Sequence, residues 1–293
     1  MSDHAPVVTI GSDMSAELFV DVSTTLRSMG VEVQTEPSGD ASRHSKVIVV
    51  VSPKGGSGKT AVSANLAVAL AQRHPGRVVA IDLDAQFGDL SLALSLTPER
   101  TLAQLARTSE IDVTSLKLHL TSAAEGLFVL AGAHNPVDAD AIGHEHVDRV
   151  VPLLADNFDY VIVDTAAGLD DRTLAALDHA TDILLVSSLD VTSVRSLRSA
   201  TDAFDHLGLT GERLMVLNRA DSKVGLDPSD AEDAMGMRIG CSIPSSRQIP
   251  MSLNLGTPVV LSEPKSPVAK QFRNLAELYA PAETKRTRKG WLR

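Results

Sequence analysis

The chain has 293 residues, of which 43% are hydrophobic and 22% are charged, as is typical of a globular protein with a substantial core. Its formal net charge is −10, from 27 Lys and Arg against 37 Asp and Glu, which argues against a surface that coats DNA. No run approaches the roughly 18 apolar residues that cross a bilayer, and the first residues lack a signal-peptide pattern. We therefore expect a cytoplasmic protein.

Residues 1–45 predict a small β-α-β unit followed by a linker. Residues 7–10 and 31–33 are the expected strands, residues 16–29 the expected helix, and residues 37–42 form a polar run. A unit of this size cannot bury a core of its own, so we expect it to pack against the main domain or a partner.

From residue 46 to residue 281, predicted strands alternate with predicted helices. The expected strands are 46–51, 77–82, 126–131, 160–164, 182–187, 213–218 and 240–243. The expected helices are 60–73, 101–107, 139–156, 170–179, 191–207, 229–235 and 266–279. Strands rich in Val, Ile and Leu between amphipathic helices indicate an α/β fold, a doubly wound and mostly parallel sheet with helices on both faces. Ligands of such sheets bind at the carboxyl ends of the strands.

The first of these strands runs into a glycine-rich turn and then a helix, an order that predicts a phosphate-binding loop. Glycines allow the backbone to curl so that successive N–H groups point inward, and the positive end of the helix adds to the field. We expect Lys59 to contact the β- and γ-phosphates and the Thr60 hydroxyl to bind Mg²⁺. The remaining residues predicted to bind nucleotide in this segment are Gly55, Gly56, Ser57, Gly58 and Ala61.

Carboxylates follow two of the later strands. Asp82 and Asp84 lie two residues apart, so they share a face in extended backbone, and one can support the Mg²⁺ shell while the other orients the attacking water. Helix capping or turn formation is the alternative role for Asp82. Asp164 ends an apolar strand in the manner of a Walker B carboxylate, which reaches Mg²⁺ through water. Gly168 can bring a backbone N–H close to a γ-phosphate and act as a switch.

The run Lys54-Gly55-Gly56-Ser57-Gly58-Lys59-Thr60 resembles the deviant Walker loop of the MinD/ParA family of ATPases, and Asp82-x-Asp84 and Asp164-Thr165-x-x-Gly168 follow in the family's order. The family more often has a hydrophobic residue at position 57 and proline at position 166. The runs 82–90 and 218–226 look most like the CpaE/TadZ branch, which is associated with Flp/Tad pilus assembly.

This resemblance implies an ATPase that forms a homodimer when it binds ATP with Mg²⁺. Lys54 would reach the phosphates of the partner subunit, Asp84 would act on the water nucleophile, and Asp164 would hold the outer metal shell. The three residues predicted to be catalytic are Lys54, Lys59 and Asp84, and the three predicted to hold metal are Thr60, Asp82 and Asp164. The implied partner is a protein of a pilus, secretion or division assembly.

The base and the C-terminal tail leave alternatives open. Asn218 and Arg219, with Asp221, resemble the guanine-recognition pattern of GTPases, but they also match the family position that contacts adenine, which we favour. The basic tail, residues 282–293, is either an exposed segment or a peripheral contact with the inner face of the plasma membrane. The alternative functions are a catalytically silent nucleotide-binding scaffold and a ParA-like DNA partitioning ATPase.

Two further features have structural interpretations. Cys241 is the only cysteine and lies in an apolar stretch, so we expect a core residue and not a nucleophile. His144 and His146 are two apart in a predicted helix, where they cannot face each other, so we expect a solvated helix face and not a metal site.

Overall fold

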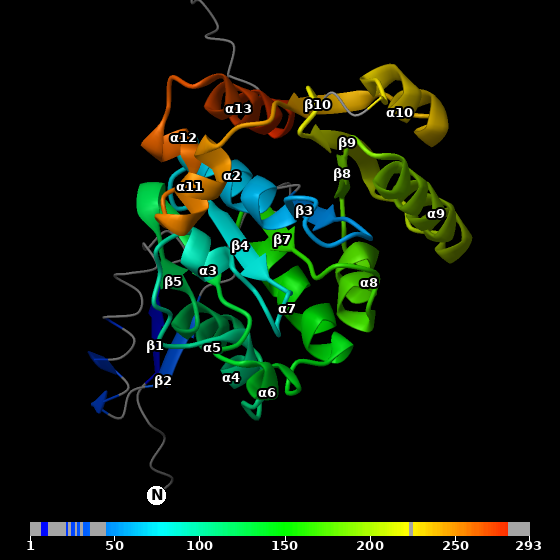
Figure 1. The fold of residues 1–293 in the computed structure, drawn as a ribbon. Helices are drawn as coiled ribbons and strands as arrows, with labels where there is room; N and C mark the ends of the chain where they lie inside the picture. The colour runs from blue at the N-terminus through cyan, green and yellow to red at the C-terminus, as the bar shows by residue number, and fades with distance from the viewer. Residues whose placement is uncertain are drawn as a thin grey trace, which may run out of the picture.

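The structure is a computed structural model that describes residues 7–10, 22, 25–26, 28–29, 32–35, 45–222 and 225–280. Figure 1 shows the ribbon. The strands of the large sheet are β3 (Lys46–Val51), β4 (Val78–Asp82), β5 (Thr121–Ser122), β6 (Leu127–Leu130), β7 (Tyr160–Asp164), β8 (Asp182–Ser188), β9 (Glu212–Asn218) and β10 (Ile239–Ile243). Every predicted strand of residues 46–281 is present, with each end within one residue of its expected place.

The sheet has eight strands in the order β10-β9-β8-β3-β7-β4-β6-β5. All neighbouring pairs are parallel except β5 with β6. Strand β3, which leads into the glycine-rich turn, lies in the middle between β7 and β8. The carboxyl ends of β3, β4, β7, β8 and β9 therefore meet at one edge of the sheet, where the expected site residues begin.

Helices cover both faces of this sheet (Figure 1). They are α2 (Lys59–Ala71), α3 (Leu90–Ala93), α4 (Leu102–Ala106), α5 (Val113–Leu118), α6 (Pro136–Ala139), α7 (His144–Asn157), α8 (Asp171–Asp178), α9 (Val191–Leu207), α10 (Pro228–Met235), α11 (Gln248–Asn254), α12 (Val259–Ser262) and α13 (Pro267–Tyr279), with a short 3₁₀ turn at Ala124–Gly126. Along β4, Val79 and Ile81 pack into one core with α4, α7, α8 and α9. Val78 and Ala80 pack into a second core with α2 and α13. The predicted doubly wound α/β fold is confirmed.

One predicted helix is wrong in its extent. The expected helix 139–156 starts too early, because α6 ends at Ala139 and α7 begins only at His144, after Gly143. The backbone N–H of Gly143 donates to Nδ1 of His146 at 2.9 Å, which caps the helix start. His144 and Glu145 are exposed at this end. The two histidines, His144 and His146, therefore lie in the first turn of α7.

The N-terminal strands are also present. β1 (Val7–Ile10) and β2 (Glu32–Thr35) pair in parallel as a separate two-stranded sheet, and β2 lies against α5. The described residues between them that are helical are 22, 25, 26 and 28. The two strands lie where strands were predicted, whereas most of the predicted helix 16–29 falls outside the described residues. The linker prediction 37–42 and the tail 282–293 fall outside the described residues.

Cys241 is buried on β10, as expected for a core residue, and burial raises the pKa of its thiol to about 11. No helix of the described part of the chain is long and apolar enough to cross a membrane.

Candidate functional site

The glycine-rich turn between β3 and α2 has the backbone geometry of a tight loop that only glycine forms easily. Gly56 and Gly58 have φ of 74° and 99°, in the left-handed region that residues with a Cβ avoid. Gly58 is the N-cap of α2, so the helix starts at Lys59. Gly55 and Gly56 are exposed, as a surface that receives a ligand requires.

Lys59 lies behind this loop and is 8% exposed. Burial lowers the pKa of its ammonium group, and the carboxylates of Asp164 and Asp84 oppose that effect. The predicted lysine and two of the predicted carboxylates are therefore electrostatic neighbours, although they come from three separate elements of the chain. A buried cation beside two carboxylates can neutralise a polyanion brought to the loop.

Asp82 and Asp84, both at the end of β4, have different surroundings. Asp82 is buried, and its two carboxylate oxygens accept hydrogen bonds from the backbone N–H groups of Asp84, at 3.1 Å, and Leu90, at 3.2 Å. Burial, and then the charge of Asp164, raise the pKa of Asp82 well above its usual range. Gly88 fits closely here, because a Cβ at this position would lie 2.3 Å from Oδ2 of Asp82. Asp82 therefore organises the loop that carries the half-buried Asp84.

Asp164 lies directly beside Asp82, because the two residues are partners in the β4–β7 register. It is fully buried, and Ser63 of α2 donates to its Oδ1 at 2.8 Å. Burial raises the pKa of Asp164 to about 6, against hydrogen bonds from Ser63 and Thr60 and the charge of Lys59. Its Oδ2 is buried and has no hydrogen-bond partner among the described residues. A buried carboxylate oxygen without a partner, next to the Thr60 hydroxyl, fits a cation such as Mg²⁺.

The segment after β7 is attached to the phosphate-loop strand. The Thr165 hydroxyl donates to the backbone carbonyl of Val50 at 2.8 Å, and the Gly168 N–H donates to the carbonyl of Ser52 at 3.3 Å. Gly168 has φ of 93°, so glycine is needed at this turn. Residues 165–168 and the loop can therefore move only together or by breaking these two bonds.

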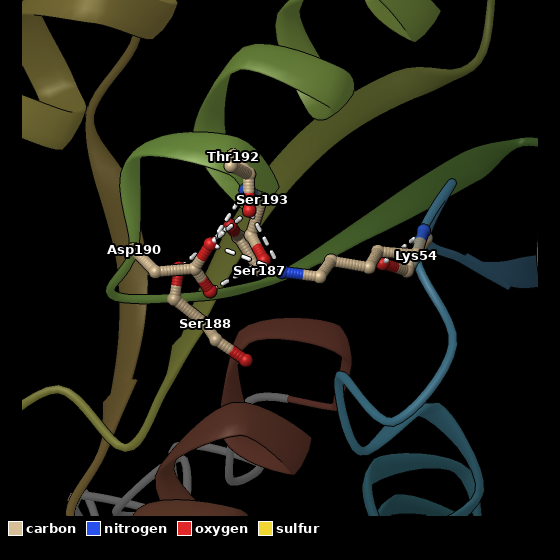
Figure 2. Close-up of polar contacts among 7 residues, drawn as sticks. Lys54, Ser187, Ser188, Asp190, Thr192 and Ser193 are labelled. Carbon is tan, nitrogen blue, oxygen red and sulfur yellow. Dashed lines mark hydrogen bonds and ion pairs between the residues drawn. The ribbon is translucent and has the colours of Figure 1, made fainter.

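Lys54 points sideways out of the loop toward the start of α9 (Figure 2). Its Nζ lies 3.2 Å from Oδ1 of Asp190 and 2.8 Å from the Thr192 hydroxyl. Asp190 also caps α9 by accepting from the Ser193 N–H and hydroxyl. Burial opposes ionisation of Asp190, but the hydrogen bonds from Ser193, Thr192 and Lys54 outweigh it and hold its pKa below the usual range. The Lys54 side chain is 46% exposed and that of Asp190 39%.

Asn218 ends β9 and reaches the loop from the other side. Its Nδ2 donates to the backbone carbonyl of Ser57 at 2.8 Å. Arg219 follows with φ of 56° and an exposed side chain. Beyond β8 and β9 lies a cavity of about 340 Å³, lined in part by Leu189, Ala220 and Asp221. Asp221 accepts from the Ser245 N–H at 2.6 Å, which fixes this loop to the segment after β10.

The structure gathers most of the predicted residues at one edge of the sheet. Lys59, Asp84 and Asp164 form one electrostatic cluster, and Asn218 and Gly168 hydrogen-bond to the glycine-rich segment. Sequence reasoning missed Ser63 and Asp190. Ser63 lies three residues after Thr60 in α2, so the helical period could have indicated that it faces the same carboxylate. Asp190 gave a weaker signal, the Asp-x-x-Ser pattern of a helix start.

Comparison with known proteins gives a consistent picture. Residues 45–210 match the AAA domain family. The septum site-determining protein MinD of Synechocystis sp. is 31% identical over 244 residues, 79% of this chain and 88% of that protein. The cell division ATPase MinD of Pyrococcus furiosus has TM-score 0.72 and 31% identity, covering 81% of this chain and 99% of that one. MinD of Pyrococcus horikoshii, solved in complex with Mg-ADP, has TM-score 0.73 and 27% identity, covering 81% and 97%.

Proposed function

Because the chain belongs to the MinD/ParA family of P-loop ATPases, we propose that it binds ATP with Mg²⁺, dimerises in the ATP-bound state, and hydrolyses ATP to ADP and phosphate as a switch. The observation that carries this proposal is the cluster of Lys59, Asp84 and Asp164 behind the glycine-rich loop. A site built this way acts by positioning and charge neutralisation and needs no covalent intermediate.

The chain's own residues have distinct tasks in this reaction. Lys59 binds the β- and γ-phosphates, while Gly55, Gly56, Ser57, Gly58 and Ala61 line the loop around them. Asp84, which is half-buried and acts on the charge of Lys59, orients the attacking water. Thr60 and Asp164 hold Mg²⁺, which when bound offsets charge on the phosphates. Asp82, whose oxygens accept two backbone N–H groups, contributes mainly by holding the loop of Asp84.

Lys54 connects this chemistry to dimerisation. In the single chain, it is paired with Asp190, and an ion pair between two half-exposed side chains contributes about 0.2–1 kcal/mol. Lys54 can therefore leave Asp190 and bind the phosphates of a partner subunit's ATP with only a small loss of free energy. We propose that this exchange distinguishes the dimer from the monomer, with Gly168 sensing the γ-phosphate.

The dimer would localise a larger assembly in the cell. The runs that resemble the CpaE/TadZ branch favour pilus or secretion machinery, whereas the MinD relatives carry the name septum site-determining. The basic tail would add a peripheral contact with the membrane. The net charge of −10 makes a DNA partitioning role the less favoured alternative.

The proposal is tested by light scattering and phosphate release with Mg-ATP. The parent should become a dimer with Mg-ATP and release phosphate, and Lys59→Ala should do neither. Lys54→Ala should bind ATP as the parent does but stay monomeric. Matched controls are Lys117→Ala, a partly buried lysine of α5, and Lys265→Ala, an exposed one.

Two outcomes would contradict it. A parent that neither binds Mg-ATP nor changes size would exclude the ATPase switch altogether. A parent that binds ATP and dimerises, but releases phosphate no faster in a single turnover than Asp84→Ala does, would be the catalytically silent scaffold instead.

A further inference from the structure

Asn218 was expected to contact the base, and the Nδ2 and Oδ1 atoms of its amide each already make a hydrogen bond within the protein. The side chain is 5% exposed. Its Nδ2 donates to the Ser57 carbonyl at 2.8 Å, and its Oδ1 accepts from the backbone N–H of Arg219 at 3.0 Å. An amide held at both ends has a fixed orientation before any ligand arrives.

The glycine-rich loop is shaped to receive this amide. A Cβ on Gly58 would lie 2.3 Å from Nδ2 of Asn218, so the amide fills the space that any other residue at position 58 would need. The Ser57 carbonyl and the Gly58 N–H belong to the same planar trans peptide and point in opposite directions. By holding the carbonyl, Asn218 therefore also fixes the direction of the Gly58 N–H, which points away from β9.

The Asn218 side chain also holds the turn that follows β9. Arg219 adopts a left-handed φ of 56°, which is unfavourable for a residue with a Cβ, and its N–H bonds to Asn218 Oδ1. The next N–H, of Ala220, donates to the carbonyl of Ile243 on β10 at 3.0 Å. A single buried amide thus connects the phosphate loop to the chain that enters the cavity beyond β9.

We propose that Asn218 is a positioning residue, which orients the phosphate-binding peptide of Ser57 and Gly58 whether or not a base is bound. This inference rests on the proposed nucleotide-binding function. A residue that orients the loop affects every ligand that carries a phosphate chain, whether or not the ligand carries a base. A residue that reads the base affects only nucleotides.

The test compares Mg-ATP with inorganic triphosphate in calorimetric titrations of the parent and Asn218→Ala. We expect the variant to bind triphosphate about tenfold more weakly, and Mg-ATP at least as much more weakly, because one preorganising hydrogen bond is lost. Asn65→Ala is the matched control, since Asn65 is an equally buried amide with two backbone partners, Ala61 and Val260, away from the loop. It should lower stability without changing the affinity for either ligand.

Hydrogen exchange of the ligand-free protein provides an independent arm. Backbone N–H groups of residues 54–59 should exchange faster in Asn218→Ala than in the parent or in Asn65→Ala. Loss of ATP affinity with unchanged triphosphate affinity would overturn the inference in favour of base recognition. Unchanged exchange in residues 54–59 would also overturn it, and this holds even if the parent binds no nucleotide, so the two failures can be told apart.

Discussion

At the scale of single residues, the surroundings of the buried carboxylate of Asp164 oppose its ionisation. Burial raises its pKa to about 6, and the hydroxyl of Ser63 and the charge of Lys59 only partly compensate. A phosphate-bound cation would relieve this restriction, because it supplies the partner that Oδ2 lacks among the described residues. Without a bound cation, the ionised carboxylate of Asp164 therefore lowers the free energy of unfolding.

This restriction predicts a pH dependence of stability without nucleotide or metal. In the unfolded chain Asp164 ionises near its ordinary pKa of about 4, whereas in the folded chain it ionises near 6. Its stabilising contribution is thus complete below pH 4 and lost as the pH rises through 6. The stability gained by Asp164→Asn over the parent should grow between pH 4 and pH 7, on the order of 1–3 kcal/mol.

Urea unfolding in a chelating buffer measures this difference directly. Asp178→Asn, which alters an exposed carboxylate of α8, should keep a constant offset from the parent over the same range. A constant offset for Asp164→Asn as well would mean that Asp164 is not held away from its ionised form.

At the scale of the elements, the turn from β3 into α2 depends on glycine for two independent reasons. Gly58 has φ of 99°, and a side chain there would collide with Asn218. The strand, turn and helix could all be predicted from sequence, because five apolar residues, three glycines and a periodic helix follow one another. The collision between a side chain at position 58 and Asn218 could not be predicted, because Asn218 lies 160 residues further along the chain.

Gly58→Ala should therefore impair both stability and binding. We expect a loss of about 1–3 kcal/mol in the free energy of unfolding, and ATP affinity at least tenfold weaker. The control is Gly208→Ala at the end of α9, where φ is 73° but nothing lies within 4 Å of an added Cβ. That variant should lose about 1 kcal/mol and bind ATP like the parent. Equal ATP affinity in both variants would contradict the assigned role of the turn.

Several short helices were not predicted. Helices α3, α5, α11 and α12 have four to seven residues, so they show little of a helical period. Helix α4, with five residues, was predicted. Short helices of this kind are held by their neighbours, as when Asn65 accepts from the Val260 N–H at 3.1 Å.

At the scale of the whole molecule, the sheet separates the parts that give stability from the edge that carries the site. Each face of the sheet packs its own hydrophobic core. The candidate site lies apart from the two cores, at the carboxyl ends of the strands. Helix α13 closes one face by packing against α2 and β10 (Figure 1). Phe272 of α13 is 1% exposed and is among the largest buried side chains of the described residues.

Phe272→Ala should lower the free energy of unfolding by about 3–5 kcal/mol, because it leaves a cavity in a closely packed core. Leu278→Ala, on the same helix but 56% exposed, should change it by less than about 0.5 kcal/mol. Urea denaturation of both variants checks the difference. Similar values for the two would mean that α13 does not close the core as described.

The sequence by itself determined the order of strands and helices, the α/β class, the glycine-rich loop and the carboxylates that follow the strands. These features depend on neighbours within a few residues, through periodicity, backbone freedom and the alternation of faces. Only the tertiary structure decided which side chains meet. The pairing of Lys54 with Asp190, the raised pKa of Asp164 and the attachment of Asn218 to Ser57 all join distant segments. Burial and hydrogen-bond geometry between such segments exist only once the sheet has brought its strand ends together.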